Sequence, residues 1–335
     1  MKSLKKKDIE TPLVEKIYSD KSLHIETPLI EKIDSDKSYK IFFKLENTQP
    51  SGSFKLRGIG YHCQKLIERG CCHFVSSSGG NAGLAVAYVG FKLEVPVTVF
   101  VPETTAIQVI HTLEKEHAKV YVKGSVWDEA HFYAQKFVEE HKGSTLVHPF
   151  DHPEIWSGHS TIIHEIKLKL PAPPSAILLS VGGGGLLCGV LEGLHAVGWS
   201  GVPVITFETI GADCFNKAIE AGYPIKLPEI KSIAKCLGSL SVLPNALEWY
   251  GKHKIFSHVV TDKTAVLACL QFANDHKMLV EPACGASLSA IYNDTLETLH
   301  KIGSIPDLSS IVVIVCGGQA VNLDDIQMWK EMFEL

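Results

Sequence analysis

The sequence predicts an α/β protein in which mostly parallel strands alternate with helices. From residue 40 onward, short apolar runs of strand character are separated by longer segments whose apolar residues recur at helical spacing. The short runs are nearly continuous in Val, Ile, Leu and Phe, which is typical of parallel strands covered by helices on both faces of the sheet. A chain of 335 residues, 45% of them apolar, is long enough for two such domains with separate cores.

These patterns place the elements along the chain. Strands are expected at 39–45, 73–76, 97–101, 119–122, 145–147, 176–180, 204–207 and 311–315. Helices are expected at 55–69, 82–93, 105–116, 125–141, 155–169, 185–197, 243–252, 262–276, 285–302 and 323–333. Proline-rich changes of composition at 149–153 and 171–174 mark candidate domain boundaries.

The N-terminus contains an internal repeat. Residues 8–22 recur as residues 24–38, with 12 of 15 positions identical. Two copies of so short a unit cannot form a solenoid, which needs at least about three stacked repeats. Only the second copy runs directly into the first predicted strand, so we expect it to belong to the fold and residues 1–23 to form a poorly ordered extension. An edge strand or an oligomer contact built by the first copy is the alternative.

Composition and charge exclude several classes of function. A net charge of −5 leaves no basic surface of the kind that binds nucleic acid. No apolar run approaches the roughly 18 residues of a membrane span, and the lysine-rich start lacks the apolar stretch of a secretory signal. Nine cysteines without a C-x-x-C spacing are typical of reduced thiols. We therefore expect a cytoplasmic protein with no membrane or nucleic-acid partner.

A glycine-rich loop between a predicted strand and a predicted helix is the strongest local signal. It reads Ser180-Val-Gly-Gly-Gly-Gly-Leu-Leu-Cys-Gly189. Consecutive glycines let backbone N–H groups converge on one point, and the helix that begins there adds its positive end, so a phosphate is the expected occupant. The loop has neither the G-x-G-x-x-G spacing of dinucleotide sites nor the lysine of a P-loop. A tight turn without a ligand is the alternative.

Two further loops that lead into predicted helices carry polar chemistry. In residues 47–55, Lys55 falls in the first turn of a helix, where the helix dipole disfavours the ammonium form and favours a neutral amine. A single lysine is usually a solvated surface residue, so this assignment needs other support. In residues 76–83, hydroxyls, glycines and Asn81 precede a helix and suit a carboxylate, although a well-capped helix would have the same sequence features.

Five motifs, taken together, resemble one family. They are PSGSFKLRG at 50–58, SSGGNAG at 77–83, SVGGGGL at 180–186, EPACGA at 281–286 and VCGG at 315–318. Their order is that of the fold-type II pyridoxal-phosphate enzymes, and the chain most closely resembles the serine/threonine dehydratases among them, from about residue 24 to the end. The resemblance implies pyridoxal 5′-phosphate as cofactor, two open twisted sheets, mostly parallel, with helices on both faces, and a homodimer. It also implies a small domain, 49–152, inserted into a large domain made of 24–48 and 153–335.

The resemblance also implies roles for individual residues. Lys55 is expected to hold the cofactor covalently and to move the Cα proton of the substrate, with Phe54 beside the cofactor. The remaining cofactor contacts are expected from Gly182, Gly183, Gly184 and Gly185 to the phosphate, from Asn81 to the ring hydroxyl and from Cys316 to the ring nitrogen. The substrate carboxylate is expected at Ser78, Gly79, Gly80, Asn81 and Ala82. A monovalent cation, expected to be K⁺, would lie at Glu208 with the carbonyls of Ala212, Leu237 and Ser239.

The implied activity is β-elimination, which converts L-serine to pyruvate and ammonia and L-threonine to 2-oxobutyrate and ammonia. Two alternatives stay open: a serine racemase, and a cofactor-binding regulator without turnover. Related racemases carry a serine where this chain has Gly79, and the glycine is expected to leave extra room near the substrate. Control by isoleucine through a C-terminal domain is not expected, because the chain ends about 17 residues after Gly318.

Overall fold

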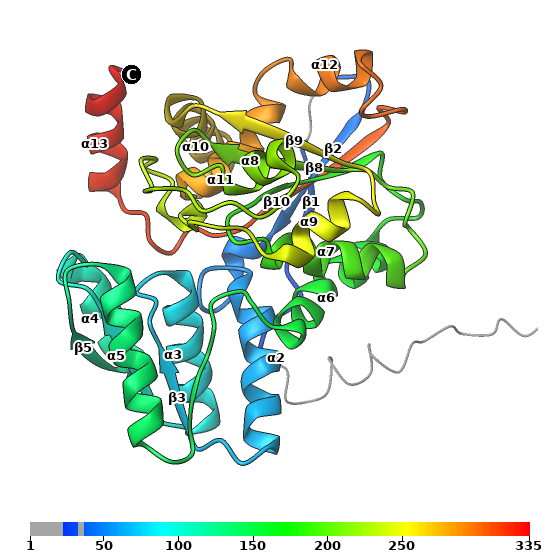
Figure 1. Cartoon of the computed structure of the whole chain (residues 1–335). Helices are drawn as coiled ribbons and strands as arrows, with labels where there is room; N and C mark the ends of the chain where they lie inside the picture. The colour runs from blue at the N-terminus through cyan, green and yellow to red at the C-terminus, as the bar shows by residue number, and fades with distance from the viewer. Residues whose placement is uncertain (1–22, 33–36) are drawn as a thin grey trace, which may run out of the picture.

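The computed structural model describes residues 23–32 and 37–335, which form two lobes built on separate sheets (Figure 1). A six-stranded sheet lies in the larger lobe and a four-stranded sheet in the smaller one. The predicted α/β class, with mostly parallel sheets and helices on both faces, is therefore confirmed. The first copy of the N-terminal repeat lies outside the described residues, so the prediction of a poorly ordered extension concerns a part of the chain that the structure does not describe.

The large sheet has the strand order β1–β2–β10–β7–β8–β9. Its strands are β1 (Leu29–Lys32), β2 (Lys40–Leu45), β10 (Ser310–Val315), β7 (Ala176–Ser180), β8 (Val204–Thr209) and β9 (Ile255–Val260). All neighbours pair in parallel except the edge strand β1, which comes from the second repeat copy and is antiparallel to β2. Every residue of β7 and β8 is buried, as the near-continuous apolar runs predicted.

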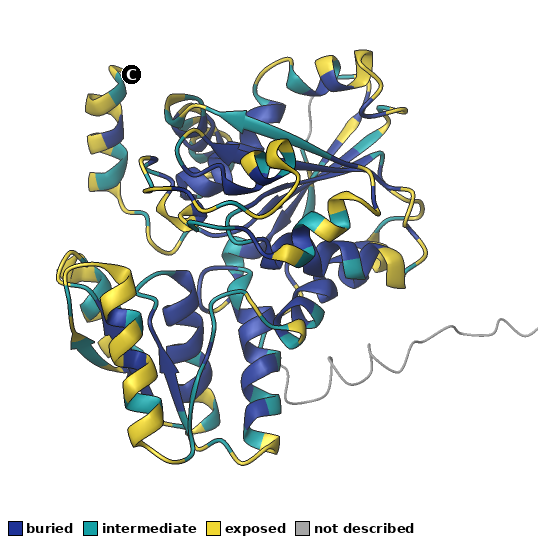
Figure 2. Cartoon of the chain, viewed as in Figure 1, coloured by how far each residue is buried: buried dark blue, intermediate teal, exposed yellow. Residues whose placement is uncertain are grey.

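The small sheet has the order β5–β4–β3–β6, all parallel. Its strands are β5 (Lys119–Val122), β4 (Val97–Val101), β3 (His73–Ser76) and β6 (Ser144–Leu146). Successive residues of β3 point to opposite faces, so Phe74 packs into the core beneath α2 and α3 while Val75 packs against α5. Helices on both faces therefore give this sheet two cores, and the buried strand interiors are visible in Figure 2.

Helices cover both sheets. Around the small sheet lie α2 (Lys55–Glu68), α3 (Asn81–Leu93), α4 (Ile107–Lys115) and α5 (Trp127–Glu140). The others are α6 (Pro153–Lys169), α7 (Gly185–Ala196), α8 (Cys214–Ala221), α9 (Pro244–Tyr250), α10 (Asp262–His276), α11 (Pro282–Leu288), α12 (Thr295–Lys301) and α13 (Leu323–Phe333). Short 3-10 turns are η1 (Glu46–Thr48), η2 (Lys235–Leu237) and η3 (Ser289–Ile291). In the part of the chain that the structure describes, no helix combines the length and apolarity needed to cross a membrane.

The structure corrects four sequence-based predictions. The edge strand β1 was not among the expected strands. The strand β9 was missed, because Ser257 and His258 interrupt its apolar pattern. The short helix α8 was also missed. The single helix expected at 285–302 is broken after η3, where the side chain of Asn293 accepts a hydrogen bond from the Thr295 amide at 2.9 Å and starts α12 anew.

Candidate active site

The candidate site forms where loops at the carboxyl ends of β3, β7 and β10 approach the first turn of α2, a position in which open parallel sheets usually bind ligands. Backbone contacts join the end of β10 to the segment before α2. The Phe54 amide donates to the Cys316 carbonyl at 3.0 Å, the Gly318 amide donates to the Gly52 carbonyl at 3.1 Å, and Ser53 pairs with Gly317 as an isolated bridge. The loop that carries Lys55 is thus held against the large sheet.

Lys55 is the first residue of α2, as the sequence predicted. Its amino group donates to the Pro149 carbonyl at 2.6 Å and lies 5.3 Å from the ring centre of Phe54 and 5.7 Å from that of Phe150. Burial of the amino group lowers the pKa of Lys55 from 10.5 to about 8. Near neutral pH a useful fraction of this amine is therefore unprotonated and able to act as a nucleophile or a base.

The glycine loop begins α7, with Gly184 in the left-handed conformation (φ 98°) at the N-cap. Phe150 lies between this loop and Lys55. A Cβ on Gly183 would come within 2.4 Å of the Phe150 ring, and one on Gly185 within 2.8 Å of its carbonyl oxygen. Only glycine fits these positions. Because the loop has no side chains there, the amides at the start of α7, a helix of 12 residues, are accessible to an anion.

Asn81 is the first residue of α3 and is buried beside Glu281, which precedes α11. Its amide nitrogen donates to the two carboxylate oxygens of Glu281 at 2.9 and 3.1 Å and to the Cys236 sulfur at 3.4 Å. The side-chain oxygen of Asn81 is buried and has no hydrogen-bond partner among the described residues. Such an atom is costly unless a ligand or water donates to it, so it indicates a ligand group at this point.

Cys316, at the end of β10, is buried and its sulfur lies 2.9 Å from that of Cys284 on α11. The contact with Cys284 and burial together raise the pKa of the Cys316 thiol well above its usual value. Cys284 is itself close to both the carbonyl and the amide of Gly317, each at 3.0 Å. Cys316 is therefore a neutral thiol, and a group placed against its sulfur meets an uncharged partner.

The loop from Ser77 to Gly80 leads into α3 and is folded by its own polar groups. The Ser78 hydroxyl accepts a hydrogen bond from the Gly80 amide at 3.3 Å, and Ser77 pairs with His131 of α5 at 2.9 Å. A Cβ on Gly83 would lie 1.8 Å from the Ser78 carbonyl, so the loop folds back over the first turn of the helix. The first amides of α3, including that of Ala82, lie at the N-terminus of the helix next to this loop. They can bind a carboxylate there.

The structure corrects the prediction of extra room at Gly79. A Cβ there would lie 3.2 Å from Val101, 3.3 Å from Thr105 and 3.5 Å from Val109. These side chains already close the space that the missing methyl group would occupy. A larger side chain would therefore press against β4 and α4 rather than enter an empty part of the site.

The predicted cation ligands lie behind the glycine loop. Glu208, on β8, is fully buried and accepts hydrogen bonds from the amides of Phe215 and Asn216 at 2.8 and 2.7 Å. Burial raises its pKa to about 8, although these amides act in the opposite direction. Leu237 packs on Gly182, with 3.1 Å between its Cα and a Cβ built there, and its carbonyl accepts from the Ser239 amide at 2.7 Å. Ala212 closes a turn with Thr209 just before α8.

A buried cluster of charges anchors the helix that carries Lys55. Arg57 is completely buried and donates to Glu46 at 2.6 and 2.8 Å and to Glu165 at 2.6 and 2.7 Å. Lys44 forms a buried ion pair with Glu165 and donates to the Thr27 carbonyl at 2.7 Å. The two cations and two carboxylates balance, so α2 is fixed to β2 and α6 two residues away from Lys55.

Sequence reasoning missed several residues of the site. Phe150, Glu281 and Cys236 contact the predicted residues directly. His159 is fully buried edge-on against Phe54, with 4.8 Å between the ring centres, and neither ring nitrogen has a hydrogen-bond partner among the described residues. The position of Glu281 in the EPACGA motif was the one available signal. The others lie in the loop before α6, in η2 and in α6 itself, where the local sequence carries no functional pattern.

Together these residues fit pyridoxal phosphate. A partly neutral amine, a glycine cradle that admits no Cβ, an unsatisfied amide oxygen and a neutral thiol are arranged around the first turn of α2. They match the amine, phosphate, ring hydroxyl and ring nitrogen contacts that such a group requires.

Comparisons with known proteins agree with this arrangement. The family model described as "Pyridoxal-phosphate dependent enzyme" matches residues 21–317. The human protein "Serine dehydratase-like" is 52% identical over 87% of this chain and 88% of its own length. Human "L-serine dehydratase/L-threonine deaminase" is 48% identical over 87% and 89%. The crystal structure of an L-serine ammonia-lyase from the fungus Rhizomucor miehei superposes with a TM-score of 0.86 at 36% identity, covering 93% of this chain and 99% of that one.

Proposed function

Because the chain belongs to the family of pyridoxal-phosphate dependent enzymes, in its serine dehydratase branch, we propose that it is an ammonia-lyase acting on L-serine and L-threonine. L-Serine gives pyruvate and ammonia, and L-threonine gives 2-oxobutyrate and ammonia. The observation that carries this function is the position of the Lys55 amine, which lies at the start of α2 between the rings of Phe54 and Phe150, with Phe150 packed on the glycine loop.

Different residues of the chain carry out different parts of the elimination. Bound pyridoxal phosphate supplies an electron sink that stabilises negative charge at the Cα of an amino acid. Lys55, as a neutral amine, takes the Cα proton. The amides at the start of α3 hold the substrate carboxylate, and Gly182 to Gly185 hold the phosphate. The rings of Phe54 and Phe150 flank the Lys55 amine and exclude water from it.

Cys316 favours elimination over reactions that need a long-lived carbanion. The contact with Cys284 and burial raise the pKa of the Cys316 thiol, so the thiol stays neutral. The chain thus has a neutral group, and not a carboxylate, where a carboxylate would keep the ring nitrogen of the cofactor protonated. The negative charge at Cα is then best relieved by loss of the β-hydroxyl group. The oxygen leaves as water, with a proton equivalent to the one that Lys55 removed from Cα, and addition of a water molecule across the remaining carbon–nitrogen bond releases ammonia and the keto acid.

The test of this function is turnover of L-serine and L-threonine by the purified enzyme, with pyruvate, 2-oxobutyrate and ammonia measured. The variant Lys55→Ala should lose both turnover and the visible absorbance of the covalently held cofactor. A variant that kept both would remove the basis of the proposal. A protein that binds the cofactor but forms no keto acid would instead be a regulator without turnover.

We propose that serine racemisation is absent. A racemase must return a proton to the face of Cα opposite Lys55, and Gly79 has no side chain that could carry one. Chiral chromatography of the L-serine reaction should therefore show no appreciable D-serine. Formation of D-serine at a rate comparable with that of pyruvate would assign the chain to the racemases.

The cation site is a further part of the proposal. Glu208 lies behind the glycine loop with the carbonyl-bearing segments of Ala212, Leu237 and Ser239, and we propose that K⁺ binds there. Activity should then rise with K⁺ in a buffer of bulky organic cations, and Glu208→Gln should weaken this dependence. Equal activity of the wild type with and without K⁺ would exclude the site.

We also propose that the protein is a cytoplasmic homodimer. Size-exclusion chromatography with light scattering is the direct measurement of the oligomeric state.

A further inference from the structure

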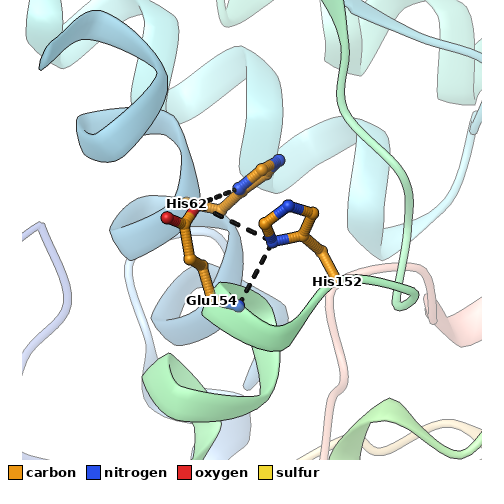
Figure 3. A group of neighbouring side chains, drawn as sticks. All are labelled: His62, His152 and Glu154. Atoms are coloured by element: carbon orange, nitrogen blue, oxygen red, sulfur yellow. Dashed lines mark hydrogen bonds and ion pairs between the residues drawn. The ribbon is translucent and has the colours of Figure 1, made fainter. Parts of the chain in front are cut away.

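Three side chains with metal-ligating atoms meet where the two lobes join (Figure 3). His62 lies on α2, and His152 and Glu154 lie at the beginning of α6. One ligand atom from each residue lies within 4.8 Å of those from the other two. None of the three takes part in the reaction described above.

Close packing of α2 on α6 brings these residues together. A Cβ on Gly58 would lie 2.4 Å from the Ile155 carbonyl, and one on Gly158 would lie 2.5 Å from the Arg57 carbonyl. The two backbones therefore approach as closely as glycine allows. His62 follows Gly58 by four positions, so it lies one turn farther along α2 and faces the first turn of α6.

The distances suit a tetrahedral ion. The His62 Nδ1 atom lies 2.8 Å from one carboxylate oxygen of Glu154, and the His152 Nδ1 atom lies 3.7 Å from the same oxygen. Nitrogen and oxygen ligands at about 2.0–2.2 Å from Zn²⁺ in a tetrahedron are roughly 3.3–3.6 Å apart. These two separations lie on either side of this range, and the ligand atoms of the two histidines lie within 4.8 Å of each other, so rotations of the side chains would bring all three around one ion. Figure 3 shows both rings turned toward the carboxylate.

The surroundings support a ligand role for Glu154. Arg69 forms an ion pair with the second carboxylate oxygen of Glu154 and also donates to the first oxygen at 3.3 Å, so it holds the carboxylate in place beside the histidines. His62 is 4% exposed, whereas His152 is 38% and Glu154 18% exposed. One ligand is thus fixed in the interior, and an ion can enter from solvent past the other two.

We propose that His62, His152 and Glu154 bind one Zn²⁺ ion, with water as the fourth ligand. Two imidazoles and one carboxylate form a ligand set that favours Zn²⁺ over Mg²⁺ or Ca²⁺, which prefer oxygen ligands alone. The ion ties α2 to α6, the helices through which the small sheet is attached to the large one. Its role is to stiffen this junction, not to take part in the chemistry at Lys55.

Three existing contacts compete with the ion. His62 pairs with the Glu154 carboxylate at 2.8 Å, and Arg69 donates to the same oxygen at 3.3 Å. The His152 Nδ1 atom accepts a hydrogen bond from the Glu154 amide at 3.2 Å and so caps α6. Water can take over this amide when the ring binds metal, and coordination by three residues offsets the loss of the cap.

The test uses the untagged holoenzyme, dialysed against chelator and then titrated with Zn²⁺ by calorimetry, with bound metal counted by mass spectrometry. We expect one ion per chain in the micromolar range or tighter, together with a rise in the melting temperature. Co²⁺ should give the visible spectrum of a tetrahedral site. His152→Asn should weaken binding by at least about tenfold and remove the Co²⁺ spectrum, because a whole ligand is lost. The control His111→Asn, at an exposed histidine on α4, should change neither.

Further variants separate a metal site from a hydrogen-bonded cap. His62→Asn and Glu154→Gln should also weaken Zn²⁺ binding, whereas Cys72→Ser, at an exposed thiol, should not. His152→Asn keeps a good helix cap but loses the imidazole, so it should retain the melting temperature of the metal-free protein and still lose the Zn²⁺-dependent rise. The proposal is overturned if no Zn²⁺ binds at roughly 10 µM free ion, or if His152→Asn binds it as the wild type does.

Discussion

The buried charge cluster around Arg57 should dominate the stability of the protein, and the variant Arg57→Met tests this. Methionine fills much of the same volume but removes the hydrogen bonds to Glu46 and Glu165, each made with two nitrogen–oxygen contacts of 2.6–2.8 Å. Glu165 then keeps its ion pair with Lys44, whereas Glu46 loses the ion pair that it makes with Arg57. Breaking a buried ion pair by removing one partner costs about 3–5 kcal/mol, and we expect a loss of that size in the free energy of unfolding.

The assay is urea unfolding of the holoenzyme followed by circular dichroism, with Lys44→Met as the matched control. Lys44 contacts Glu165 and the Thr27 carbonyl, and its removal leaves Arg57 bound to both carboxylates, so we expect a smaller loss of about 1–3 kcal/mol. Adding Glu165→Gln to Arg57→Met should restore part of the stability, because an uncompensated charge is removed.

The dependence on pH distinguishes charge from packing. Burial alone would raise the pKa of Glu165, but Arg57 and Lys44 outweigh it and hold the pKa below 4.5. A carboxyl group whose pKa is lower in the folded protein than in the unfolded chain stabilises the fold at any pH above its unfolded pKa. This stabilisation is lost as the pH falls through the folded pKa, so the wild type weakens below about pH 4.5. In Arg57→Met the pKa of Glu165 should rise and the variant should gain stability relative to wild type between pH 7 and 5. A loss under about 1 kcal/mol without this change would refute the reasoning.

Two further measurements test the site itself. Because burial lowers the pKa of Lys55 to about 8 in the cofactor-free protein, the rate of reconstitution with pyridoxal phosphate should rise with pH and level off just above that value; a rise that continues to pH 10 would show an ordinary surface lysine. Gly183→Ala should weaken cofactor binding at least about tenfold, because its Cβ would meet the Phe150 ring at 2.4 Å, whereas Gly201→Ala, with no atom within 4 Å, should bind the cofactor normally. Equal affinity in both variants would show that the loop is not a close-fitting cradle.

Much of the fold and part of the site could be predicted from sequence because the signals are local. A strand buried on both faces, such as β7, needs a continuous apolar run, and the run is visible in the chain itself. The phosphate cradle requires consecutive residues without Cβ atoms, so Gly182 to Gly185 identify it directly. The position of Lys55 likewise follows from a turn-rich stretch that leads into an amphipathic helix.

Other features depend on residues far apart in the chain, and only the tertiary structure decided them. The helix α8 was missed because its first amides are capped by Glu208, a buried carboxylate on the preceding strand, rather than by a neighbouring side chain. Phe150 contacts both Lys55 and the glycine loop only because the chain returns from the small sheet at that point. The cluster of His62, His152 and Glu154 exists because two glycines let α2 and α6 pack closely. Sequence periodicity reports which face of an element is buried, but the partner across that face is selected by packing in three dimensions.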